Sequence, residues 1–302
     1  MIERYMQFLG LDGTIKLLKA NEKPLIHSIR VNNLKIKTKD LEERLNQKGF
    51  ELGSINWVSY AFKILKETYN IGSLHEYLQG YFYIQNIASM LPPIILDPKS
   101  HEVVIDMCAA PGGKATHLSQ LMDNKGNLIL IEKNRNRIPA LEVNLRRMGI
   151  INATVLNFDA INISNLKITA DKILLDAPCT GEGLIRQDIS RKKSKKIRDI
   201  EKMSSIQKKL LNSGLNVLKP NGELLYSTCS IAPEENEFVV HDVLEERTDV
   251  EIIKTSESYG LEGLTEIYGK SLRPNLKYAH RLYPHIHDTI GFFICLIKKL
   301  SK

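Results

Sequence analysis

The stretch Val103-Val-Ile-Asp-Met-Cys-Ala-Ala-Pro-Gly-Gly-Lys114 decides the fold of this chain. A short apolar run ends in Asp106, a loop of small residues follows, and a helical pattern begins at Ala115. A strand, a tight turn and a helix start form the usual cradle for a nucleotide-like ligand in an open α/β sheet. Glycines let the backbone approach such a ligand closely, and the helix start presents free N–H groups. The stretch therefore predicts a ligand site at the carboxyl edge of a sheet.

Strand and helix patterns alternate from this stretch onward. Strands are expected at Val103–Cys108, Leu128–Glu132, Thr154–Asn157, Lys172–Asp176 and Leu224–Ser227. The helical patterns between or after them are Ala115–Met122, Asn136–Met148, Lys202–Leu218 and Pro233–Glu246. Two further strands are expected at Glu251–Ile253 and Phe292–Ile297. The alternation predicts an α/β protein whose mostly parallel sheet carries helices on both faces.

Residues 1–80 lack this alternation. Helical patterns at Glu3–Leu9, Thr14–Ala20 and Asp40–Lys48 are interspersed with strand candidates at His27–Val31 and Trp57–Phe62. This favours a small α+β module similar to an RNA-recognition fold, and an N-terminal lid on the main sheet is the alternative. The expected domains are 1–80 and 81–302, linked by a helix over Tyr83–Met90 that Pro92-Pro93 should stop.

The composition is that of a globular protein. Of 302 residues, 43% are hydrophobic and 25% charged, which excludes wholesale disorder. The net charge of +7 favours a polyanionic partner. No apolar run could span a membrane and the first residues lack a signal-peptide pattern, so a cytoplasmic protein is expected. The cysteines stand singly and far apart, which argues against disulfides and zinc clusters: Cys108, Cys179, Cys229 and Cys295.

Acidic residues end successive predicted strands. Glu132 closes the second strand about twenty residues after the glycine pair, where a carboxylate commonly binds ribose hydroxyls. Asp159 follows the third strand and Asp176 ends the fourth, so all three point to one sheet edge. Solvated strand ends are the alternative reading. Because Ala-Ala-Pro-Gly-Gly departs from the G-x-G-x-x-G pattern of nicotinamide sites, S-adenosylmethionine is the better cofactor candidate.

Two cysteines follow predicted strands in polar, turn-forming settings. They are Cys179 in Asp176-Ala-Pro-Cys-Thr-Gly181 and Cys229 in Tyr226-Ser-Thr-Cys-Ser-Ile231. Methyl transfer to carbon 5 of a pyrimidine needs a thiolate, because addition to carbon 6 makes carbon 5 nucleophilic. A carboxyl group such as Asp176 could activate the ring at nitrogen 3, and the base must leave its stack. The residues alone leave open which cysteine attacks. Cys108 and Cys295 are expected to be inert.

Three motifs in this order resemble the Sun-type RNA cytosine-5 methyltransferases, of the archaeal and bacterial tRNA-modifying type. They are Asp106-Met-Cys-Ala-Ala-Pro-Gly-Gly-Lys114, Asp176-Ala-Pro-Cys-Thr-Gly181 and Thr228-Cys-Ser230. Four other segments also resemble that family: Ser28–Asn32, Gly80–Gln85 through Ser89-Met90, Arg281–His285 and Gly291–Phe293. The resemblance implies a Rossmann-like methyltransferase sheet with an RNA-binding N-terminal module, and S-adenosylmethionine as cofactor.

The resemblance also implies residue roles. Cys229 would be the nucleophile, Cys179 would assist product release, Lys114 would lie near the target base and Asp176 would contact it. The implied cofactor-binding residues are Cys108, Ala109, Ala110, Pro111, Gly112, Gly113, Lys114, Glu132, Arg137, Asp159 and Asp176. Transfer RNA is the favoured substrate, and ribosomal RNA is the main rival. An amino-methylating enzyme is disfavoured, because the Asp/Asn-Pro-Pro-aromatic signature is absent. An idle RNA-binding or assembly factor is disfavoured by the intact cysteines.

Basic residues suggest how RNA is held. Arg191–Arg198 contains six basic residues, whose phosphate contacts would supply salt-dependent affinity, and a solvated helix face is the alternative. Lesser candidates for RNA contact are Arg30, Arg273, Arg281 and His285. The pair in His285-x-His287 has no third partner in the sequence, so no metal site is expected. The sequence is compatible with a monomer.

Overall fold

The computed structural model describes residues 1–194 and 196–301, and the side chain of residue 193 lies outside the description. The chain forms two compact units. One comprises residues 26–159, and the other combines residues 1–25 with residues 160–302. The first 25 residues therefore belong with the C-terminal half of the chain.

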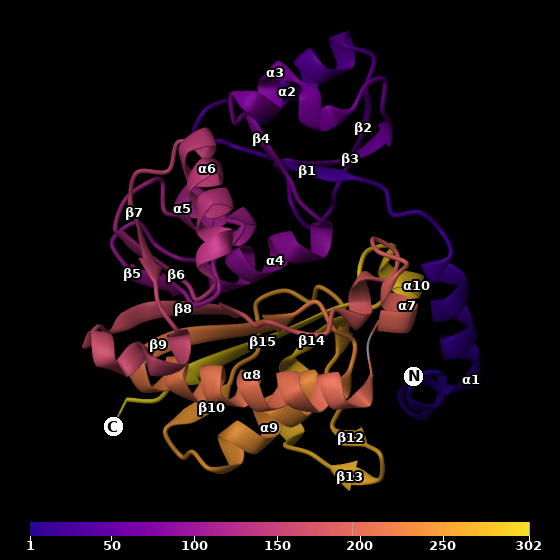
Figure 1. The fold of residues 1–302 in the computed structure, drawn as a ribbon, viewed down its shortest axis with the longest axis vertical. Coiled ribbons are helices and arrows are strands. Elements are labelled where there is room, and N and C mark those ends of the chain that lie inside the picture. The colour runs from indigo at the N-terminus through magenta and orange to yellow at the C-terminus, as the bar shows by residue number, and fades with distance from the viewer. Residues whose placement is uncertain (195, 302) are drawn as a thin grey trace. The chain divides into compact units, whose positions relative to one another are not determined.

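The unit of residues 26–159 begins with a small antiparallel sheet of strand order β2-β3-β1-β4. Its elements are β1 (Ser28–Val31), α2 (Thr38–Gln47), β2 (Glu51–Ser54), β3 (Ala61–Lys66), η1 (Ile71–Ser73), α3 (His75–Leu78) and β4 (Phe82–Ile84). Helices α2 and α3 lie together on one side of these strands (Figure 1). Ile29, Leu41 and Phe82 are among the buried side chains that join the helices to the sheet. The α+β character predicted for residues 1–80 is confirmed from residue 26 onward, whereas residues 1–25 belong to the other unit.

The same unit continues with alternating helices and parallel strands. They are α4 (Ile87–Leu96), β5 (Val103–Asp106), α5 (Gly113–Leu121), β6 (Asn127–Glu132), η2 (Arg135–Arg137), α6 (Ile138–Met148) and β7 (Ala153–Asn157). Strands β5, β6 and β7 are neighbours in that order, with Val104 opposite Leu128 and Leu130 opposite Val155. Most apolar residues of β5 and β6 are buried, as a parallel sheet covered by helices requires, whereas those of the edge strand β7 are only partly buried. The predicted strand–helix alternation is confirmed here.

The predicted helix Tyr83–Met90 is wrong in both of its limits. Tyr83 lies in β4, and α4 begins at Ile87 and continues through Pro92 and Pro93. A proline inside a helix leaves the carbonyl four residues earlier without its N–H partner. For Pro93 that carbonyl belongs to Ser89, and it accepts a hydrogen bond from Gln85 Nε2 at 2.9 Å. The helix tolerates the proline because a side chain replaces the lost donor.

The other unit contains one pair of parallel strands and a set of antiparallel strands. Its first elements are α1 (Ile2–Asn21), η3 (Ala160–Leu166), β8 (Ala170–Asp176), η4 (Glu182–Leu184), α7 (Arg191–Ser194), α8 (Ile197–Val217) and β9 (Leu218–Thr228). Then follow η5 (Pro233–Glu235), α9 (Glu237–Glu245), β10 (Val250–Ile252), β11 (Leu261–Glu262), β12 (Glu266–Ile267), β13 (Lys270–Ser271), η6 (Pro274–Tyr278), β14 (His280–Leu282), α10 (Pro284–His287) and β15 (Phe292–Lys299).

Strands of this unit run in the order β11-β14-β15-β9-β8. Strands β8 and β9 are parallel, as predicted, with Leu174 opposite Leu225 and Asp176 opposite Ser227. Strand β15 is antiparallel to β9, β14 and β10, while β12 and β13 form a separate hairpin. Helices α8 and α9 lie together on one face of the strands (Figure 1). The parallel pair brings the carboxyl ends of β8 and β9 to one edge.

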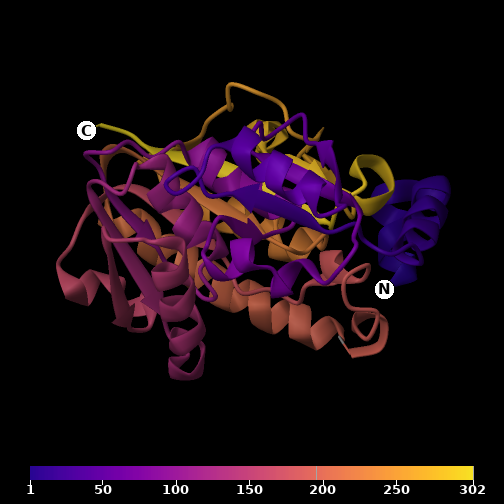
Figure 2. The ribbon, with the colours of Figure 1, turned by 90° about the horizontal axis from the view of Figure 1, so that it is seen from above.

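Helix α1 joins the two helices predicted at Glu3–Leu9 and Thr14–Ala20. Gly10 departs from helical geometry at φ 67° and ψ 178°, so the helix is kinked between its halves. Both views show α1 beside α10 (Figures 1 and 2). In the described part of the chain, no helix combines the length and apolar character that a membrane crossing needs.

Candidate active site

The loop between β5 and α5 is held to its own strand and to the next one. The N–H of Cys108 donates to Asp106 Oδ1 at 3.2 Å, and the N–H of Ala109 donates to the Ile131 carbonyl at 3.0 Å. Gly112 then takes φ 107°, which disfavours any side chain. Helix α5 begins at Gly113. The predicted cradle is therefore a fixed loop that leads directly into a helix N-terminus.

Arg30 ties this loop to the small antiparallel sheet. Its guanidinium donates to Gln85 Oε1 at 2.6 Å, to the Gly113 carbonyl at 2.7 Å and to Thr116 Oγ1 at 2.8 Å. The side chain is completely buried. Arg281 is also buried, and donates to the Ile231 carbonyl at 2.6 Å. The prediction that these two arginines contact RNA is wrong, because their charged ends are sealed inside the protein.

Glu132 lies at the end of β6 with a carboxylate oxygen still available. Its Oε1 accepts a hydrogen bond from the N–H of Asn134 at 2.8 Å. Its Oε2 forms an ion pair with Arg137 at 3.2 Å and accepts no hydrogen bond, although it is buried. Arg137 also donates to the Ala110 carbonyl in the glycine-rich loop. A buried acceptor beside such a loop suits a ribose hydroxyl, so these residues fit an adenosyl cofactor.

The remaining predicted cofactor residues are divided between the two units. Asp159 follows β7 and forms an ion pair with Lys133 at 2.7 Å. Lys114 lies in the first turn of α5. Asp176 belongs to the other unit, at the end of β8. The loop residues Cys108–Lys114, Glu132, Arg137 and Asp159 thus share one unit, at the carboxyl ends of its parallel strands.

Cys179 and Cys229 come together after the parallel strands β8 and β9. Their sulfur atoms are 3.0 Å apart, both thiols are free and both residues are partly exposed. The hydrogen bond with Cys229 raises the pKa of the Cys179 thiol well above its ordinary value. Burial and the negative charges of Glu235 and Asp176 raise it further. The two thiols therefore share one hydrogen bond, in which either sulfur atom can be the donor.

Asp176 lies beside this pair at the same strand edge. It accepts a hydrogen bond from Ser227 Oγ at 2.9 Å, across the register that places the two residues opposite each other. The edge thus carries a carboxylate and two thiols, which is the set expected for attack on a pyrimidine. Cys295 is buried in β15, as predicted for an inert thiol, and burial raises its pKa.

The structure also reveals a residue that sequence reasoning missed. Glu235 is completely buried and accepts hydrogen bonds from the N–H of Thr180 at 2.8 Å and from Thr180 Oγ1 at 2.6 Å. Thr180 follows Cys179 directly. A buried charged side chain usually has hydrogen-bond partners. A run of acidic residues shortly after Cys229 could therefore have indicated a carboxylate that bonds to the cysteine loops. That run is the sequence Glu234-Glu235-Asn236-Glu237.

The basic run Arg191–Arg198 is partly engaged within its own unit. Arg191 donates to the Thr180 carbonyl at 3.0 Å and pairs with Asp188 at 3.2 Å, and Lys192 pairs with Glu22. Residue 195 lies outside the described residues. The run therefore supports the loop after Cys179, and its RNA contact stays a prediction.

His285 and His287 do not assemble a metal site. His287 Nδ1 accepts a hydrogen bond from the N–H of Tyr283 at 3.0 Å. Among residues 1–194 and 196–301, no group of three or more His, Cys, Asp or Glu side chains is placed to hold a metal ion.

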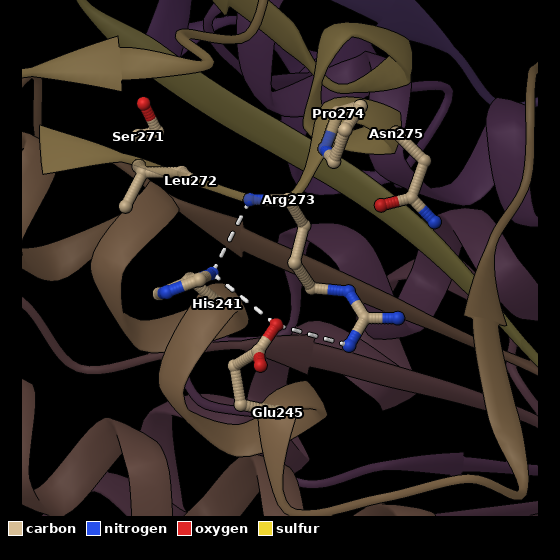
Figure 3. Close-up of a pocket in the computed structure, with 7 residues that line it drawn as sticks. All are labelled: His241, Glu245, Ser271, Leu272, Arg273, Pro274 and Asn275. Carbon is tan, nitrogen blue, oxygen red and sulfur yellow. Dashed lines mark hydrogen bonds and ion pairs between the residues drawn. The ribbon is translucent and has the colours of Figure 1, made fainter.

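Figure 3 shows a pocket at the end of α9. Its lining residues follow both cysteines in the chain. It is lined by His241, Glu245, Ser271, Leu272, Arg273, Pro274 and Asn275. Arg273 donates to the Leu244 carbonyl at 2.8 Å and pairs with Glu245 at 3.4 Å, so its charge is largely used within this pocket. None of the predicted catalytic or cofactor residues lines it.

Comparison with known proteins places these features in a family. Residues 93–298 match the model of the family described as 16S rRNA methyltransferase RsmB/F, and residues 1–87 match the N-terminal domain of 16S rRNA methyltransferase RsmF. The chain is 37% identical over 306 residues to a tRNA (cytosine(49)-C(5))-methyltransferase of Pyrococcus abyssi, covering 99% of this chain and 95% of that protein. It is 36% identical over 306 residues to the 28S rRNA (cytosine-C(5))-methyltransferase of Mus musculus, covering 100% of this chain and 38% of that protein. The chain spans between 38% and 50% of the length of this and three other eukaryotic relatives.

Solved structures agree with the family match. A methyltransferase homolog protein from Pyrococcus horikoshii is 44% identical, with a TM-score of 0.90 over 99% of this chain and 94% of that chain. NSun6 from the same organism, solved with the S-adenosylmethionine analogue SFG, is 26% identical, with a TM-score of 0.89 over 100% and 98% of the two chains. The predicted Rossmann-like fold and Sun-type resemblance are confirmed, and so is S-adenosylmethionine as the cofactor of the family.

Proposed function

The chain belongs to the family described as 16S rRNA methyltransferase RsmB/F, and from this membership we propose that it methylates carbon 5 of cytosine in RNA. The observation that carries the proposal is the pair of free thiols, Cys179 and Cys229, 3.0 Å apart at the strand edge beside Asp176. An idle RNA-binding factor has no use for two thiols held in this way. Relatives whose names give cytosine-C(5) methylation of tRNA or rRNA support the same chemistry.

Cys229 is the proposed nucleophile. Its thiolate adds to carbon 6 of the flipped cytosine, and the electron pair of the 5,6 double bond shifts toward nitrogen 3. Asp176 contacts the nitrogen 3 edge and stabilises the proton carried there. Carbon 5 is then electron-rich enough to accept a methyl cation equivalent. A water molecule then takes the carbon 5 proton, and the freed electron pair restores the 5,6 double bond. The electron pair of the Cys229–carbon 6 bond returns to the Cys229 sulfur, which leaves the ring.

Cys179 is the proposed partner in release. A raised pKa favours the protonated form of the Cys179 thiol, which is the form that can donate a proton. Its proton lies within hydrogen-bond distance of the sulfur that must leave carbon 6. A proton donor at that position favours departure of Cys229. The unequal roles of the two cysteines follow from the motifs that contain them, Thr228-Cys-Ser230 for the nucleophile and Asp176-Ala-Pro-Cys179 for release.

S-adenosylmethionine supplies an electrophilic methyl group when bound. The residues proposed to hold it are the Cys108–Lys114 loop, Glu132, Arg137, Asp159 and Asp176. Glu132 has a buried oxygen ready to accept hydrogen bonds from ribose hydroxyls, and Arg137 fixes both that carboxylate and the Ala110 carbonyl. Lys114 is proposed to lie near the target base.

Transfer RNA is the proposed substrate. The support is the similarity to the tRNA (cytosine(49)-C(5))-methyltransferase of Pyrococcus abyssi, which is 37% identical over 306 residues. Ribosomal RNA is the second candidate, favoured by the description of the family itself. Both substrates agree with the net charge of +7 and with a cytoplasmic location.

Residues 1–80 are proposed to bind RNA and residues 81–302 to catalyse. The family models support a boundary in this region, because one ends at residue 87 and the other begins at residue 93. A monomer is sufficient for this scheme, since both cysteines and the glycine-rich loop come from one chain.

Labelled methyl transfer to separate tRNA and rRNA substrates, followed by bisulfite mapping, tests the proposal. We expect 5-methylcytosine in tRNA, none with Cys229→Ala, and a gel-stable protein–RNA adduct with Cys179→Ala. Full activity of Cys229→Ala would contradict the nucleophile, and modification of rRNA alone would transfer the proposal to the second substrate.

A further inference from the structure

Two consecutive residues outside the predicted site contact both cysteine-bearing loops. Glu235 ends η5 and Asn236 lies between η5 and α9. Both side chains are completely buried within their unit. Burial of a carboxylate is costly unless several donors satisfy it, so its partners indicate what it contributes.

Glu235 and its neighbour Gln207 hold the residues on either side of Cys179. Thr180 donates to the Glu235 carboxylate through its N–H at 2.8 Å and through its hydroxyl at 2.6 Å. Gln207 Nε2 donates to the Pro178 carbonyl at 2.8 Å and to Glu235 Oε1 at 3.2 Å. The backbone before and after Cys179 is therefore fixed by one hydrogen-bonded group.

Asn236 holds the residues on either side of Cys229. Its Oδ1 accepts a hydrogen bond from Thr228 Oγ1 at 2.6 Å, and its Nδ2 donates to the Ser230 carbonyl at 3.0 Å. The hydroxyl of Tyr226, in the strand that leads to Cys229, donates to the Glu235 carbonyl at 2.5 Å. The dipeptide thus bonds to three residues adjacent to the two cysteines, Thr180, Thr228 and Ser230.

We propose that Glu235 and Asn236 are positioning residues that keep the Cys179 and Cys229 sulfur atoms within proton-transfer distance. This inference rests on the proposed roles of the two cysteines. Neither residue touches a sulfur atom in the hydrogen bonds described above. Glu235 acts on release, because it fixes the loop of Cys179, and Asn236 acts on attack, because it fixes the loop of Cys229.

The charge of Glu235 has a second effect. The groups whose charge acts on Cys179 are Cys229, Glu235 and Asp176, and the negative charge of Glu235 contributes to the raised pKa of the Cys179 thiol. Glu235→Gln removes that charge, yet its amide can still bond Thr180 if the hydroxyl turns to accept. Alkylation of Cys179 should then begin at a lower pH than in the unaltered protein. A residue with only a structural role would not shift this profile.

Kinetics and adduct formation test the positioning. Glu235→Ala should lower kcat about a hundredfold with an almost unchanged KM for RNA, because misplacement by about 1 Å can have that effect. It should accumulate the protein–RNA adduct, whereas Asn236→Ala should form less adduct. Glu235→Gln should recover most of the rate. Glu234→Ala is the matched control, because Glu234 pairs with Arg4 instead, and it should behave like the unaltered protein.

A milder pair of variants serves if Glu235→Ala does not fold. Thr180→Val removes one donor to Glu235 and should accumulate adduct, while Thr180→Ser keeps the hydroxyl and should not. Variants of Glu235 and Thr180 that match Glu234→Ala in rate, adduct and alkylation profile would overturn the inference. Cys229→Ala and Cys179→Ala, assayed alongside, test the proposed function separately: if Cys229→Ala stays active, the function fails whatever Glu235 does.

Discussion

Replacement of Gly183 by alanine should displace the nucleophile through the backbone. The N–H of Gly183 donates to the Cys229 carbonyl at 3.0 Å, and its own carbonyl accepts from the N–H of Gly291 at 2.9 Å. A Cβ atom at Gly183 would lie 2.2 Å from the Gly291 carbonyl oxygen and 2.7 Å from that of Cys229. Both obstacles are backbone atoms, so no side chain can turn away to relieve the contact.

The size of the effect follows from these distances. Because Cβ contacts under 3.0 Å are essentially never seen, the segments must separate by an amount on the order of 1 Å. Overpacking of this kind costs about 1–3 kcal/mol of the free energy of unfolding. A shift of about 1 Å at a reacting group can lower the rate about a hundredfold. We therefore expect Gly183→Ala to lower the rate about a hundredfold and the free energy of unfolding by about 1–3 kcal/mol.

Initial rates of labelled methyl transfer and urea unfolding measure both quantities. Gly13→Ala is the control, because the nearest atom to its Cβ is a side-chain carbon of Leu9 at 3.2 Å, inside α1. The control should change the free energy of unfolding by less than about 1 kcal/mol and leave the rate unaltered. A Gly183→Ala protein with normal stability and normal rate would refute the reasoning.

Three further predictions concern Arg30, the thiol pair and an acidic ion pair. Arg30→Met should lower the free energy of unfolding by about 3 kcal/mol, because three buried acceptors lose their donor; a change below about 1 kcal/mol in urea unfolding would contradict this. Cys229→Ala removes the hydrogen bond that contributes most to the raised pKa of Cys179, so iodoacetamide should modify Cys179 at a lower pH. An unchanged pH profile of modification, measured by peptide mass spectrometry, would contradict this prediction. The hydrogen bond from Arg247 lowers the pKa of Asp249, so its stabilisation is present above the ordinary value of 3.8 and is lost as pH falls through the lowered pKa. Asp249→Asn should therefore reduce the acid dependence of the free energy of unfolding, measured by urea unfolding, by a detectable amount of up to about 1 kcal/mol, and an unaltered dependence would contradict it.

Local patterns predicted the parallel strands well. Strands β6 and β7 were located to within one residue, because short apolar runs there end in acidic or amide residues. Strand β9 begins at Leu218, earlier than the predicted start at Leu224. The prediction starts too late because Lys219-Pro220-Asn221-Gly222 is typical of a turn. The structure accommodates this segment with a register shift opposite Ala170 and Lys172. A shift of this kind depends on the neighbouring strand and has no local signal.

The candidate site was only partly accessible to sequence reasoning. The cysteines and the glycine-rich loop stand in short motifs, so their positions could be read directly. Arg30 and Arg281 are different, because their burial depends on carbonyls far away in the chain. The buried carboxylate of Glu235 likewise depends on a hydrogen bond from Thr180, 55 residues earlier in the chain. From the sequence alone, a charged residue is expected at the surface. This expectation fails for Arg30, Arg281 and Glu235, because residues far away in the chain supply their hydrogen-bond partners.

The central claim is that Cys229 bonds to the cytosine ring. RNA transcribed with 5-fluorocytidine tests it directly, because fluorine replaces the proton that must leave carbon 5 and so traps the adduct. Trypsin separates the two cysteines into peptides 173–186 and 210–247. Mass spectrometry should find the methylated nucleotide on the peptide that contains Cys229. Attachment to the peptide that contains Cys179 would contradict the account.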